Sequence, residues 1–178
     1  MTDYSSSLEK WSRLLIPTQV IQKRLLFLAQ NLRKYLLDSV ILSPVREGGN
    51  HFWDMLAPMV RTKSRVIPIK VVSYRDHRLP GTPVLELPDD YPARGNRIIL
   101  LDDIVDTGGT QSALMRQLLI RQAKEVRSIC LLDKPSRRRY QVAPEFSGFV
   151  IPNLFVFGCG MDWQGKYREL SEIRYVLP

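Results

Sequence analysis

Apolar residues recur along the chain at spacings that predict alternating helices and strands. From residue 18 to residue 36 an apolar side chain appears every three or four positions, which is the repeat of an amphipathic helix with one buried face. The residues that set this repeat are Ile21, Leu25, Leu28, Leu32 and Leu36. Thr18 precedes them and belongs to a residue type that caps helix N-termini, so we expect a helix capped by Thr18.

Largely apolar runs follow, and they predict strands buried on both faces. The runs cover residues 39–45, 66–74, 97–101 and 126–132. Between them, one helical pattern extends from a Gly48-Gly49 turn to about Val60, and a second carries Leu114 and Leu118 on one side. Strands that alternate with helices predict an α/β domain, with a mostly parallel sheet flanked by helices and joined by right-handed crossovers.

Residues 75–96 break this alternation. The segment holds four prolines and two glycines and has little periodicity, so it is predicted to be a long loop. Loops of that length in a compact domain are usually functional lids or partly disordered segments. No internal repeat or flexible linker divides the chain, which indicates a single domain.

Composition places the chain among soluble globular proteins, with 44% apolar and 25% charged residues. No apolar run approaches the roughly 20 residues that cross a bilayer, and the N-terminus has no secretory pattern, so we expect a cytoplasmic protein. Cys130 and Cys159 lack metal-ligand spacing and are expected to be buried thiols. The net charge of +8 indicates an anionic partner and leaves nucleic acid, a membrane surface and polyphosphate open.

A loop rich in acids, threonines and glycines follows the apolar run that ends at Leu101. In an open α/β sheet, ligands bind outside the carboxyl ends of the strands, which is where this loop falls. Glycines expose backbone N–H groups, and threonine hydroxyls add donors at a helix N-terminus that favours anions. The predicted phosphate cradle consists of Asp102, Asp103, Asp106, Thr107, Gly108, Gly109 and Thr110.

Taken singly, the three aspartates also fit ordinary turn and N-cap positions. The loop has no Lys before its Thr, which excludes the nucleotide-triphosphate loop, and it lacks the three spaced glycines of the dinucleotide fingerprint. Two adjacent carboxylates beside a phosphate cradle suit ribose hydroxyls and Mg²⁺, which binds through one or two carboxylates together with substrate phosphates.

The order of residues from Asp102 to Thr110 resembles the signature of the type I phosphoribosyltransferases. Two further stretches, residues 131–138 and 155–168, resemble the hypoxanthine-guanine members of that family, and the likeness runs from Ile16 to Pro178. Residues 1–15 are therefore expected to form an N-terminal extension to a single domain over 16–178. The resemblance implies a small hood built from the chain-terminal segments and a flexible lid entered through Ser73 and Tyr74.

The resemblance also implies roles on the purine side of the site. Lys134 would donate to the exocyclic oxygen of the base, which favours a 6-oxo purine over adenine because adenine would present another donor. Phe155 would stack on the ring, the backbone of Val156 would pair with the base edge, and Asp162 would close the far side. Ordinary core packing for Phe155 and a solvated basic loop over Lys134 to Arg139 are the competing interpretations.

On the pyrophosphate side, the resemblance implies that Gly48 and Arg168 bind phosphoribosyl pyrophosphate and that Mg²⁺ is held with help from Asp102, Asp103 and Asp162. Asp106 is the family's candidate general base, which takes the proton from purine N7 as N9 attacks the ribose. Members of the family are dimers or tetramers, so a homodimer or homotetramer is expected.

Two positions depart from the family pattern. Glu47 stands where a Lys or Arg is usual next to pyrophosphate, and its carboxylate should repel that group unless the side chain points away. Gly109 is a choice shared with xanthine-guanine enzymes, so xanthine remains an alternative substrate. A regulator that binds nucleic acid is the other alternative, and it is disfavoured because Asp106, Lys134, Asp162 and Arg168 are all retained.

Overall fold

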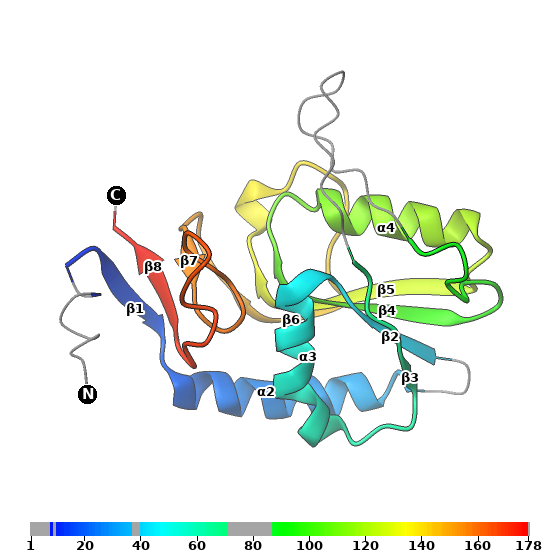
Figure 1. The fold of residues 1–178 in the computed structure, drawn as a ribbon, viewed down its shortest axis with the longest axis horizontal. Helices are drawn as coiled ribbons and strands as arrows, with labels where there is room; N and C mark the ends of the chain where they lie inside the picture. The colour runs from blue at the N-terminus through cyan, green and yellow to red at the C-terminus, as the bar shows by residue number, and fades with distance from the viewer. Residues whose placement is uncertain (1–7, 9, 37–39, 71–86, 178) are drawn as a thin grey trace.

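The computed structural model describes residues 8, 10–36, 40–70 and 87–177, which form a five-stranded sheet covered by helices and a smaller sheet beside it (Figure 1). The main sheet has the order β3-β2-β4-β5-β6, and all four of its pairings are parallel. Its strands are β2 (Val40–Pro44), β3 (Arg65–Val66), β4 (Arg97–Val105), β5 (Glu125–Asp133) and β6 (Phe146–Val150). The predicted α/β class with a mostly parallel sheet is confirmed.

Alternate residues of the central strands point to opposite faces, and each face packs against its own helices. Leu42, Ile99 and Leu101 belong to a core shared with α2 (Thr18–Arg33) and α3 (Arg46–Val60). Their neighbours in sequence, such as Ile41 and Leu100, belong to a second core that contains buried residues of α4 (Gly109–Ile120). Because both faces are covered, these strands are apolar on both sides.

The smaller sheet is the predicted hood. It has the order β1-β8-β7 with antiparallel pairings, and it lies at one end of the main sheet (Figure 1). Its strands are β1 (Ser12–Ile16), β7 (Val156–Phe157) and β8 (Ile173–Val176). Ser12 pairs with Val176, so part of the segment expected as an extension contributes an outer strand of the hood.

Two local predictions about helix starts are wrong. Thr18 is the first residue of α2, and its hydroxyl lies 3.0 Å from that of Ser171 and caps no helix N–H, because Pro17 takes the N-cap position. The Gly48-Gly49 pair lies inside the first turns of α3 and forms no separate turn. The predicted end of α3 at Val60 is confirmed. The predicted buried face of α2 is confirmed for Ile21, Leu25, Leu28 and Leu32, whereas Leu36 lies beyond the end of the helix at Arg33 and is half-buried.

The strands also differ in length from the prediction. β4 continues four residues past Leu101 to Val105, so Asp102 and Asp103 are strand residues. β3 covers only Arg65 and Val66, although Ile69 makes a further parallel bridge to Val45. Residues 87–96 of the predicted loop contain no helix or strand apart from a single bridge at Arg94. Residues 71–86, which include Ser73 and Tyr74, lie outside the described residues.

Both cysteines are buried and free, as predicted. None of the described helices is long and apolar enough to span a membrane.

Candidate functional site

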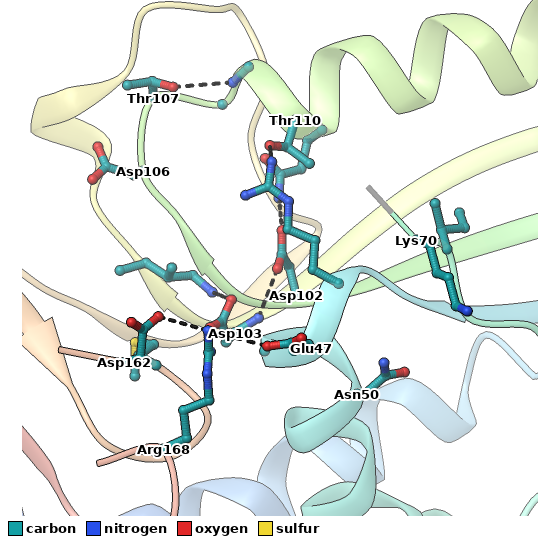
Figure 2. A pocket seen from close by; sticks show the side chains of 18 residues that line it. Glu47, Asn50, Lys70, Asp102, Asp103, Asp106, Thr107, Thr110, Asp162 and Arg168 are labelled. Atoms are coloured by element: carbon teal, nitrogen blue, oxygen red, sulfur yellow. Dashed lines mark hydrogen bonds and ion pairs between the residues drawn. The ribbon is translucent and has the colours of Figure 1, made fainter. Parts of the chain in front are cut away.

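The order of the parallel strands creates the site. The chain runs from β2 outward to β3, then crosses back to β4 and continues outward to β5 and β6, so the strand order reverses between β2 and β4. A cavity of about 910 Å³ opens at the carboxyl ends of these two strands. α3 and α4 both begin there, and residues of the first turn of each helix line the cavity (Figure 2).

The two acids at the end of β4 differ in their surroundings. Asp102 is 5% exposed, and its carboxylate accepts hydrogen bonds from the side chain of Gln111 at 2.5 Å and from the N–H of Asp103 at 3.1 Å. Asp103 accepts the N–H of Ile104 with its Oδ1 at 2.9 Å. Gln111 and the backbone thus hold Asp102, and the side chains of Asp102 and Asp103 also hydrogen-bond to each other.

Both carboxyls are harder to ionise than usual. Burial raises the pKa of Asp102 well above its ordinary value, and the negative charge of Asp103 raises it further. Burial also raises the pKa of Asp103, although hydrogen bonds and the positive charge of Arg168 act in the opposite direction. A cation bound between these groups would lower both pKa values.

The predicted phosphate cradle forms the turn into α4. Gly108 occupies the N-cap position with φ of 83°, and a Cβ there would come within 2.6 Å of the Val142 side chain. Thr107 accepts the N–H of Gly109 with its hydroxyl at 3.4 Å (Figure 2). The N–H groups of the first turn of α4 border the cavity together with Thr107 and Thr110.

The first turn of α3 forms the opposite wall. Gly48 packs directly on Asp103, because a Cβ at Gly48 would lie only 2.0 Å from Oδ2 of that carboxylate. Arg46 adopts a positive φ of 59°, an uncommon conformation for a residue with a side chain, and donates from Nη2 to the hydroxyl of Thr110 at 2.9 Å. The starts of the two helices are thereby connected across the cavity.

Asp106 lies between two cations. Its Oδ2 is 3.5 Å from Nζ of Lys134, and its Oδ1 accepts Nε of Arg137 at 3.0 Å. The adjacent Arg138 pairs with Asp133 and donates to backbone oxygens of β4 and the cradle. The basic cluster is therefore largely engaged at the site, and Lys134 is buried, which overturns the interpretation of the cluster as a solvated loop.

Arg168 lies at the hood side of the cavity and contacts two carboxylates (Figure 2). Its Nη2 is 2.7 Å from Oδ1 of Asp162 and 3.4 Å from Oε2 of Glu47, and its Nη1 donates to the carbonyl of Gly160. Glu47 does not point away from the cavity, although 82% of its side chain is exposed. Glu47, which departs from the family pattern, therefore contacts Arg168, the arginine expected to bind pyrophosphate.

Of the expected base-binding residues, Asp162 lines the cavity, whereas Lys134, Phe155 and Val156 do not. Val156 is buried in β7, whereas Phe155 is 55% exposed. Such exposure contradicts ordinary core packing for Phe155. Its ring meets that of Trp163, the residue after Asp162, with 4.9 Å between centroids.

Several residues that line the cavity were not singled out from the sequence. Gln111 holds Asp102, while Asn50 and Lys70 lie across the cavity from Asp106 and Asp162 (Figure 2). Arg137 is connected to the site through its ion pair with Asp106, which lines the cavity. Lys70 was detectable in principle, because it follows a strand at the same carboxyl edge as the cradle.

The described residues of the lining include five carboxylates and three cationic side chains. The acids are Glu47, Asp102, Asp103, Asp106 and Asp162, and the cations are Arg46, Lys70 and Arg168. In a protein of net charge +8, an acid-rich cavity with a phosphate cradle suits an anionic ligand only when further cations accompany it.

A model of the phosphoribosyl transferase domain matches residues 21–164, which is most of the chain. The chain belongs to the phosphoribosyltransferase family. This phosphoribosyltransferase is 32% identical over 168 residues to the hypoxanthine-guanine phosphoribosyltransferase of Bacillus subtilis, with 93% of each chain covered. It is 33% identical over 167 residues to the hypoxanthine phosphoribosyltransferase of Escherichia coli, covering 92% of this chain and 94% of the relative.

Solved structures show the same fold in this phosphoribosyltransferase and in related enzymes. The hypoxanthine phosphoribosyltransferase of Trypanosoma cruzi, in complex with its product IMP, superposes with a TM-score of 0.82 at 26% identity, covering 93% of this chain and 94% of that one. The hypoxanthine-guanine enzyme of Bacillus anthracis also gives a TM-score of 0.82 at 26% identity, covering 93% and 97%.

The contact between Gly48 and Asp103 yields a first prediction. Gly48→Ala inserts a methyl group where Asp103 Oδ2 lies, so the carboxylate must move and the transferase activity should fall about 100-fold, as expected for a displacement of about 1 Å in a catalytic site. Steady-state kinetics measure the fall. Gly95→Ala is the control, because a Cβ there meets no atom within 4 Å; its positive φ of 73° should lower the melting temperature slightly and leave activity intact. Unchanged activity in Gly48→Ala would contradict the importance of this contact.

Proposed function

We propose that this phosphoribosyltransferase joins hypoxanthine or guanine to the anomeric carbon of phosphoribosyl pyrophosphate, forming IMP or GMP and releasing pyrophosphate in purine salvage. The observation that carries the proposal is the position of Lys134, which is buried and 3.5 Å from Asp106. This pair places a donor suited to a 6-oxo purine beside the candidate general base. The names of the B. subtilis and E. coli relatives support the same class of substrate.

The base would bind between the cradle and the hood. Lys134 would donate to O6, the exposed Phe155 ring would stack on the purine face, and the backbone of Val156 would pair with the base edge. Asp162 would close the far side, held in place by Arg168 and by the N–H of Gly165 at 2.8 Å from its Oδ2. Guanine, hypoxanthine and xanthine share the 6-oxo group that Lys134 would select.

The ribose phosphate would bind in the cradle. The N–H groups at the start of α4 and the hydroxyls of Thr107 and Thr110 would surround the 5′-phosphate, and this use of Thr110 would replace its bond to Arg46. Asp102 and Asp103 would lie near the ribose hydroxyls. Gly48 would present the α3 backbone, and Arg168 the guanidinium, to the pyrophosphate.

The residues at the end of β4 fit magnesium as the cofactor. Oδ2 of Asp103 faces the cavity beside Gly48, and the acid-rich lining needs additional positive charge. Within the described residues, no three His, Cys, Asp or Glu side chains form a group that could hold a metal by themselves. This agrees with an ion bound by one or two carboxylates together with substrate oxygens, with Asp103 first, then Asp102 and Asp162. When bound, magnesium would supply positive charge to the departing pyrophosphate.

The chemistry assigned to the protein's own residues is proton transfer and positioning. N9 of the purine forms a bond to the anomeric carbon while the bond to pyrophosphate oxygen breaks, and the proton on N7 passes to the carboxylate of Asp106. Arg168 would stabilise charge on the leaving group. Arg137 and Lys134 orient Asp106 through its two oxygens. Ser73 and Tyr74 are proposed to belong to the lid that excludes water.

The proposal places the enzyme in the cytoplasm as a homodimer or homotetramer, in line with its family. A xanthine preference is the second candidate, because Gly109 gives the cradle the residue found in xanthine-guanine enzymes. A nucleic-acid-binding role is not proposed, since the basic cluster from Lys134 to Arg138 is engaged with Asp106, Asp133 and backbone oxygens.

The base specificity is tested with phosphoribosyl pyrophosphate, magnesium and each of hypoxanthine, guanine, xanthine and adenine in a spectrophotometric assay. Hypoxanthine or guanine should give nucleotide and adenine should not, because Lys134 can donate but cannot accept a hydrogen bond. Adenine turnover at a rate comparable to that of hypoxanthine would overturn the assignment. Xanthine as the best substrate would favour the second candidate.

Asp106→Asn tests the general base. The substitution retains size and hydrogen bonding but removes the proton acceptor, so kcat should fall by about 100-fold or more while nucleotide affinity persists. Single-turnover kinetics and nucleotide titration separate the two effects. An unaltered turnover number would remove Asp106 from proton transfer.

Glu47→Lys tests the acid that contacts Arg168. The change removes a competitor for the guanidinium and adds positive charge near the pyrophosphate, so KM for phosphoribosyl pyrophosphate and the inhibition constant of pyrophosphate should each fall by up to about tenfold. KM for the purine should hardly move. Glu169→Lys, an exposed position outside the cavity lining, controls for the change in net charge. If both constants rise instead, Glu47 assists pyrophosphate binding.

A further inference from the structure

Five aromatic rings of the hood form a continuous cluster that ends at the proposed purine site. Trp11 stacks on Phe157 with 5.1 Å between centroids and on Trp163 with 6.0 Å, at interplanar angles of 22° and 26°. Trp163 in turn meets Phe155 edge to face, at 4.9 Å and 74°. Tyr167 closes the cluster against Trp11 and Phe157.

Phe155 is the outermost member of this cluster. It is 55% exposed, and within the described part of the chain the Trp163 ring is the only ring that it contacts. Its backbone is fixed, because the carbonyl accepts the N–H of Val176 from β8 at 2.9 Å. The orientation of its ring therefore depends on Trp163, since an edge-to-face partner favours one ring position over others.

Trp163 is itself held by a tight turn. Its backbone exchanges two hydrogen bonds with Lys166, each of 3.0 Å, and the two residues between them, Gln164 and Gly165, have positive φ values of 52° and 75°. This is the backbone of a two-residue hairpin turn. Asp162 accepts the N–H of Gly165, so one turn positions both the acid that lines the cavity and the ring that contacts Phe155.

Trp11 supports the other side of Trp163. It precedes β1, and its carbonyl accepts the N–H of Leu177 at 2.9 Å, which attaches it to the strand end beside β8. A hollow of about 550 Å³ borders Trp11, Trp163 and Tyr167. Among the described residues that line this hollow, the aromatic rings are those of Trp11, Trp163 and Tyr167, and the other side chains are aliphatic, amide or charged, so none of them offers a ring in place of that of Trp11.

We propose that Trp11 and Trp163 are positioning residues for the purine: the two rings fix the orientation of the Phe155 ring, and through it the affinity for the base. On this account Trp11, which lies in the segment expected as an extension, contributes to the base site. The inference rests on the proposed function, because it takes Phe155 to be the stacking partner of the purine.

The test replaces each tryptophan with leucine or with phenylalanine. Leucine retains apolar volume but removes the aromatic ring, whereas phenylalanine retains a ring. In Trp11→Leu and Trp163→Leu, KM for hypoxanthine should rise about three- to tenfold, the range that one edge-to-face pair supplies, while KM for phosphoribosyl pyrophosphate stays within about twofold. Trp11→Phe and Trp163→Phe should restore most of the purine affinity. Trp53→Phe is the matched control: Trp53 belongs to α3, it makes no ring contact with the five-ring cluster among the described residues, and the change should leave both constants unchanged.

Equal constants for leucine, phenylalanine and wild type would overturn the proposal, as would a parallel change in both Michaelis constants, which indicates general loss of structure. A second readout does not depend on the leucine variants folding. In the Trp53→Phe protein the remaining tryptophans are Trp11 and Trp163, and IMP binding should alter their fluorescence; no change contradicts the proposal. Failure of the proposed function would appear differently, as absence of hypoxanthine turnover in the wild-type enzyme.

Discussion

The parallel pairing of β2 with β4 is the constraint on which the rest of the structure depends. Leu42 lies opposite Ile99 and Pro44 opposite Leu101, so both strands end at the same edge of the sheet. After β2 the chain continues to β3 on one side of the pair, and after β4 it continues to β5 on the other side. The starts of α3 and α4 therefore lie close together. A parallel sheet buried on both faces can open to ligands only at such an edge, and the whole cavity is built there.

This edge is electrostatically unbalanced in the protein alone. Asp102 is buried and the adjacent Asp103 partly buried, the pKa values of both are raised, and Asp106 lies between the cations Lys134 and Arg137. Arg168 is likewise divided between Asp162 and Glu47. This mixture of acids and bases is the basis for the proposed ligand, which carries both negative phosphates and an accompanying cation. In that proposal Glu47 is the acid expected to weaken binding of the phosphates.

The hood carries residues that are proposed to bind the base, and its strands come from distant parts of the sequence. β8 lies between β1 and β7, so the residues that follow Leu154 are held against a strand from the N-terminal end of the chain. Gly158, Cys159 and Gly160 all have positive φ values, and their turn directs Asp162 toward the main sheet. The residues proposed to bind the base therefore lie largely outside the segment that carries the family's phosphate signature.

The sequence by itself determined the fold class and the turn that leads into α4, because both depend on local patterns. Apolar runs and helical repeats specified the α/β alternation, and the order of residues from Asp102 to Thr110 specified a turn at a helix N-terminus. Two predictions from the sequence were wrong: Thr18 as a helix cap, and a turn at Gly48 and Gly49. Composition does not reveal that Pro17 takes the cap position or that Gly48 lies against Asp103. Only the tertiary structure decided which side chains meet. The contacts of Arg168 with Glu47, of Arg137 with Asp106 and of Trp11 with Trp163 join residues 31 to 152 positions apart, and no pattern within a short window encodes such pairings.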